Sequence, residues 1–256
     1  MYKFRLPALL LVSFFLFQAC QKEDAIYNPD VTYGTLTDTD GNDYRTVTIG
    51  TQVWMAENLR TTLYADESEI TDGNEESEWS GKEGSYCWYD KNARKHKKTY
   101  GALYSWSAVN SGKLCPTGWH VPDIGEWMIL QNYLIDNQFN YDGSASGNKI
   151  AKSLASTKEW DPGSENGSPG LDPTTNNRSG FSALPAGLRD PTHGWNLFKG
   201  AGTSCGWWSS IPYGSGFALH ASLDNHYESL HIDDPGQMIT IIWSYGFSVR
   251  CIKNDQ

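Results

Sequence analysis

Alternation of apolar and polar side chains dominates the chain and predicts β-strands. The alternation is clear over residues 45–49, where a valine and an isoleucine share one face and threonines share the other. Residues 52–56 begin a second strand after a Gly-Thr turn, so the two segments predict an N-terminal hairpin or meander. The same period returns at residues 217–223 and 246–252, and the C-terminal third is therefore also expected to consist of strands.

Helical periodicity is rarer than strand periodicity. Asp123 and Glu126 have the spacing of a capping box, and a tryptophan and two leucines follow at positions i, i+3 and i+7 of one face. This pattern predicts an amphipathic helix over about residues 123–137. Two shorter helices are expected within residues 100–110 and 148–155.

The remaining segments are typical of loops. Residues 66–83 are acidic and predict an exposed loop, and the basic residues 91–98 predict a second solvent-facing loop. Residues 142–147 and 160–180 are rich in Gly, Ser, Asn, Asp and Pro, which is typical of long connections. The chain is therefore expected to adopt an α+β fold with twisted antiparallel sheets, two or three short helices and long loops.

The amino-acid composition and the absence of known catalytic motifs limit the classes of function that the protein can have. The 256 residues include 30 acidic and 20 basic side chains, and a formal net charge of −10 argues against a nucleic-acid partner. The 11 Trp, 14 Tyr and 9 Phe supply a large core and exclude a disordered chain. The sequence contains no GxSxG, HExxH or Walker motif, so no catalytic residue, resident metal or cofactor is predicted, and whether the protein is an enzyme stays open.

The N-terminus resembles an export and anchoring signal. An apolar run at residues 6–17 follows two basic side chains and is too short to span a bilayer securely. It ends at Ala19-Cys20, which resembles a bacterial lipobox, and the acidic residues that follow resemble the export signal of surface lipoproteins. We expect residues 1–19 to be a signal peptide, Cys20 to be acylated, and residues 20–37 to tether a domain of residues 38–254. The protein would then be an outer-membrane lipoprotein exposed at the cell surface; an ordinary secretory peptide cleaved near Ala19 is the alternative.

Four further cysteines are present in this chain: Cys87, Cys115, Cys205 and Cys251. In an exported protein they predict two disulfides, for which three connectivities are possible. No two are spaced as CxxC, which argues against a zinc site on these thiols. Cys251 alternates with polar neighbours and is expected to point inward, whereas Cys205, among Gly and Ser residues, is the one alternative candidate for a reactive thiol.

Adjacent tryptophans are the main candidates for a binding surface. Side chains at successive positions of one strand leave opposite faces, so either the sheet is covered on both faces or one of Trp207 and Trp208 is exposed. An exposed tryptophan would form a platform for a sugar ring or a protein partner, and the alternative is that both belong to the core. The residues expected to border such a platform are Trp195, Tyr213, Asp224 and Asn225.

Three histidines, His220, His226 and His231, form the one histidine cluster in the sequence. If His220 and His231 lie on strands, each falls on the face opposite its apolar neighbours. We therefore interpret the cluster as solvent-facing histidines, with a metal site as the alternative.

Four stretches together resemble a known family, the Fibrobacter succinogenes major paralogous domain. The most specific stretch runs Cys-Pro-Thr-Gly-Trp-His-Val-Pro, and the resemblance covers about residues 38–253. The stretches that carry it are 40–59, 100–104 with 114–122 and 126–127, 179–187, and 207–210 with 246–251. The family is related to the C-type lectin-like fold, which also hosts formylglycine-generating enzymes. The resemblance implies a Cys115–Cys251 disulfide, and it leaves Cys87 and Cys205 for a second bridge.

The resemblance does not define a function, because one fold hosts many activities. The tether, the aromatic surplus and the missing catalytic motifs favour a binding or adhesion module for a glycan or another extracellular macromolecule. The glycan triplets of calcium-dependent lectins do not occur in the sequence. The alternatives are a metal enzyme of the formylglycine-generating type and a structural, fimbria-like surface component.

Overall fold

A computed structural model describes residues 26–75, 79, 84–193, 197–238 and 241–255. The expected signal peptide, the acylation site Cys20 and the platform residue Trp195 lie outside these described residues. None of the helices in the described part has both the length and the apolar character needed to cross a bilayer.

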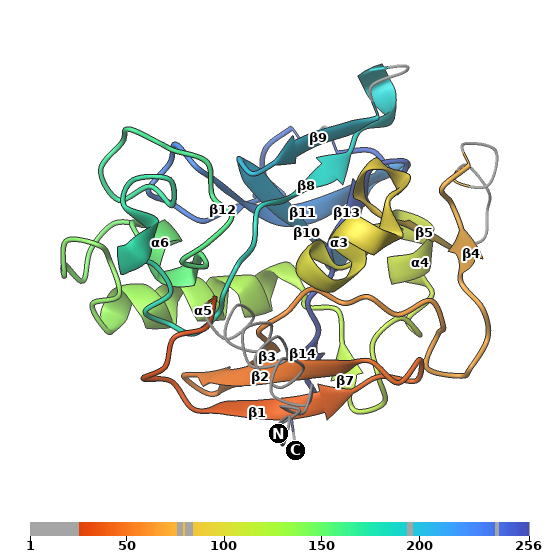
Figure 1. The fold of residues 1–256 in the computed structure, drawn as a ribbon, viewed down its shortest axis with the longest axis horizontal. Helices are drawn as coiled ribbons and strands as arrows, with labels where there is room; N and C mark the ends of the chain where they lie inside the picture. Colours follow the sequence, from red (N-terminus) through yellow and green to blue (C-terminus); the bar gives the residue numbers. More distant parts are fainter. Residues whose placement is uncertain (1–25, 76–78, 80–83, 194–196, 239–240, 256) are drawn as a thin grey trace, which may run out of the picture.

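The first of two sheets is antiparallel and contains the predicted N-terminal meander. Its strands follow the order β1-β2-β3-β14-β7 and lie in the lower part of Figure 1. The bounds are β1 Tyr33–Thr37, β2 Asp43–Ile49, β3 Gln52–Met55, β7 Trp119–His120 and β14 Ile252–Lys253. The alternation in β2 places Val47 and Ile49 in the core, so the meander prediction is confirmed.

The second sheet is larger and mixed. Its order is β12-β11-β10-β8-β13-β6-β5-β4, with β9 paired to β8, and the β10–β8 and β4–β5 pairs are parallel. The bounds are β4 Thr71–Asp72, β5 Ser85–Cys87, β6 Leu103–Ser105, β8 Ala186–Arg189, β9 Phe198–Ala201, β10 Ser204–Tyr213, β11 Phe217–Asp224, β12 His231–Ile232 and β13 Gly246–Phe247. The strand predicted at 217–223 is confirmed as β11. The alternation at 246–252 is divided between β13 and β14, which belong to different sheets.

The helices are few, as expected, but two of the predictions about them are wrong. The main helix α5 (Ile124–Asp136) has the predicted capping box, in which the Asp123 carboxylate accepts the Glu126 N–H and the Glu126 carboxylate accepts the Asp123 N–H. The basic segment predicted as a loop forms α3 (Ala93–Tyr100), whose first turn is capped by the Asn92 side chain. The helix predicted at 100–110 is reduced to α4 (Trp106–Asn110), because positive φ at Gly101 ends α3 and β6 follows.

The shorter helical elements complete the fold. The helix α6 (Ala151–Leu154) lies within the segment predicted at 148–155. Three 3-10 turns, η1 (Tyr89–Lys91), η2 (Pro173–Thr175) and η3 (Pro191–His193), connect the larger elements. With two sheets and few helices, the protein has a mixed α+β fold.

Core side chains cover both faces of the second sheet. Trp207 packs on one face with Trp127 of α5 and with Phe181, while Trp208 packs on the other face with Trp106 and Phe247. In Figure 1, α5 lies between β1–β3 below and the β10–β12 region above. Both adjacent tryptophans are 0% exposed, so the sheet is buried on its two sides at this point.

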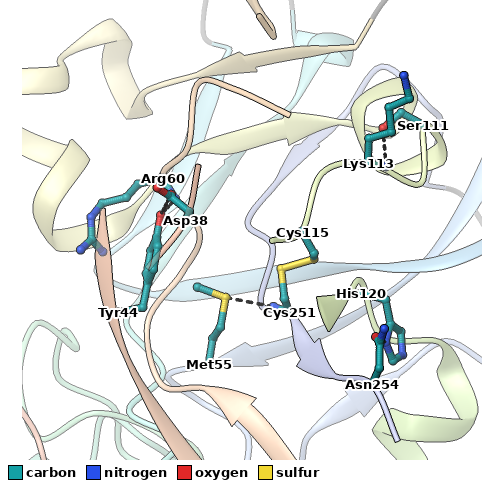
Figure 2. The surroundings of a disulfide bond; sticks show 10 residues. All are labelled: Asp38, Tyr44, Met55, Arg60, Ser111, Lys113, Cys115, His120, Cys251 and Asn254. Atoms are coloured by element: carbon teal, nitrogen blue, oxygen red, sulfur yellow. Dashed lines mark hydrogen bonds between the residues drawn. A yellow bond between two sulfur atoms is a disulfide. The ribbon is translucent and has the colours of Figure 1, made fainter. Parts of the chain in front are cut away.

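One disulfide joins the middle of the domain to its C-terminal part. Cys115, before β7, is bonded to Cys251, before β14, across 136 residues of sequence, and the Met55 sulfur lies beside the bridge, where it accepts the Cys251 N–H (Figure 2). The pairing implied by the family resemblance is therefore present in the structure.

The second bridge, Cys87–Cys205, is not formed, which corrects the prediction. Both residues are buried free cysteines, and burial raises the pKa of each thiol to about 12. Cys87 lies on β5 and Cys205 on β10, and β8, β13 and β6 separate these strands in the sheet. At about 4.8 Å per strand the two backbones are about 19 Å apart, far beyond the ~7 Å limit for a disulfide. A thiol with a raised pKa in a closed core is also a poor nucleophile, so Cys205 is a structural residue.

Candidate functional site

An open groove lies at the β4–β5–β6 end of the second sheet. Its volume is about 730 Å³, and it combines aromatic walls with hydroxyl, amide and charged groups. The residues lining it are Tyr64, Ser68, Glu69, Thr71, Trp79, Gly84, Ser105, Trp106, Ser107, Asn110, Ser111, Lys113, Trp243 and Ser244. They come from segments far apart in the sequence, which only the tertiary structure brings together.

Tyr64 and three tryptophans form the aromatic part of the groove, and hydrogen bonds to or from backbone groups hold each tryptophan. The Trp79 indole N–H donates to the Ser244 carbonyl at 2.7 Å, and the Trp106 backbone N–H donates to the Trp243 carbonyl at 3.4 Å. The Trp243 indole N–H donates to the Phe217 carbonyl at 2.7 Å, which fixes the ring beside the start of β11. Trp79 and Trp106 are buried, whereas Trp243 is 41% exposed and is the ring that solvent reaches most.

The polar rim comes from two turns that an ion pair connects. Lys113, which follows α4, contacts the Asp66 carboxylate at 2.7 Å, and the Lys113 carbonyl accepts the Ala65 N–H. Hydrogen bonds from Lys113 and from Ser68 lower the pKa of Asp66 to about 2, so this carboxylate is ionised at neutral pH. Asn110 at the end of α4 is exposed on the same rim.

Such an arrangement suits a ligand that carries both a flat apolar face and many hydroxyls. An accessible indole offers a stacking surface, and Ser, Asn, Glu and Lys groups offer hydrogen-bond donors and acceptors around it. Among ordinary biological ligands, sugars have this combination. The groove is open, so an extended chain could lie along it.

The tryptophan platform does not form, and the alternative, that both tryptophans belong to the core, is confirmed. Trp207 and Trp208 are fully buried, and their indole N–H groups donate to the Asn58 side chain and the Tyr104 carbonyl. Asn225 is 2% exposed, and its amide donates to the carbonyls of Asp161 and Pro162. The two remaining described candidates, Tyr213 and Asp224, are partly exposed at opposite ends of the β10–β11 hairpin and border no common surface.

The solvent-facing interpretation of the histidines is also wrong for His220. Its side chain is 12% exposed and stacks on Phe247, because the second face of β11 is covered by core. His231 is the more exposed partner, with ring centroids 5.5 Å apart, and a hydrogen bond with Asp233 raises the pKa of His231. His226 is exposed and its imidazole contacts neither of the two.

Trp243 and the rim residues were missed at the sequence level. Trp243 lies in a run, 239–243, that is apolar and rich in β-formers, but within its described residues this run forms a single bridge, Phe217–Ile242. Trp243 follows this bridge and is 41% exposed. No local pattern identifies the exposure of such a ring, because it depends on which segments pack beside it in the folded chain.

The protein thus has a mixed α+β fold and an open groove lined by aromatic and polar side chains. Residues 47–253 match the profile of the Fibrobacter succinogenes major domain, which covers most of the sequence. The chain belongs to this family. No curated protein and no solved structure shows significant similarity to it.

Proposed function

We propose that the protein is a surface-exposed bacterial lipoprotein whose domain binds a glycan through the groove at Trp243. The single observation that carries this proposal is the combination of a 41% exposed indole with hydroxyl, amide and charged groups in one cavity of about 730 Å³. An open groove of this kind suits an extended ligand better than a small one that must be enclosed.

The finer fold assignment, a C-type lectin-like domain, is part of the same proposal. Two features support it: the disulfide between Cys115 and the C-terminal Cys251, and the combination of twisted, mainly antiparallel sheets with few helices and long connections. An experimental structure compared with C-type lectin-like domains would test it.

Trp243→Ala should weaken glycan binding to the groove at least tenfold. Removing the indole deletes the stacking surface, and tenfold corresponds to about 1.4 kcal/mol, a modest loss for an aromatic anchor. Trp243→Phe should retain most of the affinity, since the ring remains although its hydrogen bond to Phe217 is lost. A glycan array would identify the ligand, and isothermal titration calorimetry would measure the change.

Tyr227→Ala provides the matched control for this experiment. Tyr227 is 65% exposed and lies beyond the far end of β11 from Trp243, about 23 Å away along the strand. Its removal should leave glycan affinity unchanged. An array without a hit, or a Trp243→Ala variant that binds as well as the parent, would contradict the proposal, and isolation of the protein as an ordered assembly would favour a structural surface component instead.

The anchoring part of the proposal has its own test. Mass spectrometry of the membrane fraction should find acyl chains on Cys20, and protease added to intact cells should cleave the domain. Cys20→Ser should release the protein from the membrane fraction, because more than one acyl chain is needed for stable anchoring and all would be lost. Unmodified Cys20 in a membrane-bound protein would contradict it.

A further inference from the structure

Two histidines and one aspartate converge at the edge of the second sheet, on the side of β11 away from β10. His220 comes from β11, His231 from β12, and Asp233 follows β12 directly. One potential ligand atom from each lies within 4.8 Å of the other two. This cluster is independent of the Trp243 groove and shares no residue with its lining.

The strand register brings the three side chains to one face. β11 and β12 are antiparallel, with Ala221 opposite Ile232, and the Asp233 N–H donates to the His220 carbonyl at 3.1 Å. His220 and Asp233 are therefore cross-strand neighbours, and His231 lies two residues before Asp233 on the same face. The backbone, not a mobile loop, sets the spacing of the three groups.

Packing and hydrogen bonds hold two of the three groups in place. The His220 ring stacks on Phe247, with centroids 5.1 Å apart, and its Nδ1 lies 2.6 Å from Asp233 Oδ2. The same carboxylate oxygen accepts the His220 backbone N–H at 2.8 Å. The other carboxylate oxygen lies 3.1 Å from His231 Nε2, and the His231 side chain is 59% exposed. The cluster is thus anchored on its inner side and open on its outer side.

We propose that His220, His231 and Asp233 bind a divalent transition-metal ion of the zinc type. Two imidazole nitrogens and one carboxylate oxygen form a donor set that zinc and its neighbours prefer over calcium or magnesium. Zinc at about 2.0–2.1 Å from each donor needs donors about 3.3 Å apart. His220 Nδ1 lies 2.6 Å from Asp233 Oδ2 and His231 Nε2 lies 3.1 Å from Asp233 Oδ1, so both imidazoles already lie beside the carboxylate and the closer pair must open by less than about 1 Å. Small side-chain rotations complete the site. Each ligating nitrogen is then unprotonated, because a charged imidazole releases one proton to solvent and a neutral imidazole carries its proton on the other ring nitrogen.

The ion would fasten β12 to β11 and keep a coordination position open. Three protein ligands fill three of the four positions of a tetrahedral ion. The His231 side chain is exposed, so water or a donor atom from another molecule can take the fourth position. β12 has only two residues, so an ion held by both strands would stabilise this short edge more than its few backbone hydrogen bonds do.

The site is tested by titration with zinc chloride of purified protein from which all metal has first been removed. Calorimetry should show one zinc per chain, and zinc should raise the unfolding temperature in a concentration-dependent manner. His231→Ala should weaken zinc binding at least tenfold. Because His231 is exposed, this variant should fold normally, which circular dichroism would verify. Cobalt in place of zinc should give the visible absorption of a four-coordinate ion, and His231→Ala should change that spectrum.

His226→Ala is the matched control, since His226 is an exposed histidine whose side chain is not part of the cluster. It should bind zinc as the parent does. Absence of zinc binding by the parent would overturn the proposal and leave Asp233 as a bridge between two imidazoles. Undiminished binding by His231→Ala, loss of binding in His226→Ala, or calcium binding as strong as zinc binding would overturn it equally.

Discussion

Replacing Arg250 with methionine is expected to destabilise the fold by about 3–5 kcal/mol, because the hydrogen bonds of a buried guanidinium to several neutral acceptors are lost. Arg250 is 0% exposed, and burial lowers the pKa of its guanidinium to about 10, so the side chain remains charged at neutral pH. The variant would leave buried acceptors without a donor, each costing about 1–3 kcal/mol. Urea denaturation would measure the change.

The network around Arg250 explains the size of this effect. The guanidinium donates to the Asn58 side chain at 2.9 Å, to the Ser182 carbonyl at 3.0 Å and to the Phe181 carbonyl, and it lies over the Phe181 ring. Asn58 also accepts the Trp207 indole N–H and donates to the Tyr100 carbonyl and the Ser248 hydroxyl. One charged side chain therefore connects segments that are distant in sequence.

Two further variants separate this network from general effects of substitution. Arg94→Met, on the exposed surface of α3, should change stability by no more than about 0.5 kcal/mol. Arg250→Lys keeps the charge but cannot reach all the acceptors at once, and it should fall between the parent and Arg250→Met. Stability of Arg250→Met equal to that of the parent would show that the network contributes little.

Removing the Cys115–Cys251 disulfide is expected to cost about 4–5 kcal/mol. The bridge closes a loop of 136 residues of sequence, and the entropy that such a cross-link removes from the unfolded chain grows with loop length. The double variant Cys115→Ala/Cys251→Ala should unfold at lower urea concentration. A reductant should destabilise the parent but leave the double variant unchanged.

The two free cysteines provide the control for this experiment. Cys87→Ala/Cys205→Ala should keep the response to reductant, because it leaves the bridge intact. Alkylation of the unreduced, denatured protein should label Cys87 and Cys205 and spare Cys115 and Cys251. A peptide cross-linked through Cys87 and Cys205 would contradict the structure described here.

The stretches that carry the family resemblance meet in the core, not at the groove. Asn58, the Phe181-Ser182 segment, Trp207 and Arg250 each belong to one of these stretches, and all contribute to the buried network. The residues that carry the family resemblance therefore belong to the buried network that holds the sheets together. The groove residues Trp243 and Asn110 lie outside the recognised stretches, so under the proposed function we expect binding specificity to depend on such residues.

Local patterns predicted the regular elements best where side chains obey one simple period. The capping box at Asp123 and Glu126 and the alternation in β2 and β11 were sufficient, because their hydrogen bonds and exposed faces are set within a few residues. The basic segment that forms α3 was mistaken for a loop, since charge dominates its composition. Its helix depends on the Asn92 cap and on the packing of His96 and Tyr100.

Which side of a strand meets solvent depended on contacts that lie far away in the sequence. The alternation placed Trp207 opposite Trp208 and His220 opposite Leu219, but a second layer of core covers both faces of the sheet. Strand order likewise separated Cys87 from Cys205 and brought His220 beside Asp233. The periodicity of apolar side chains and the residues that favour turns are local features, so they can be recognised in the sequence itself. Burial, disulfide partners and the two candidate sites arise from pairs of segments whose proximity only the folded topology creates.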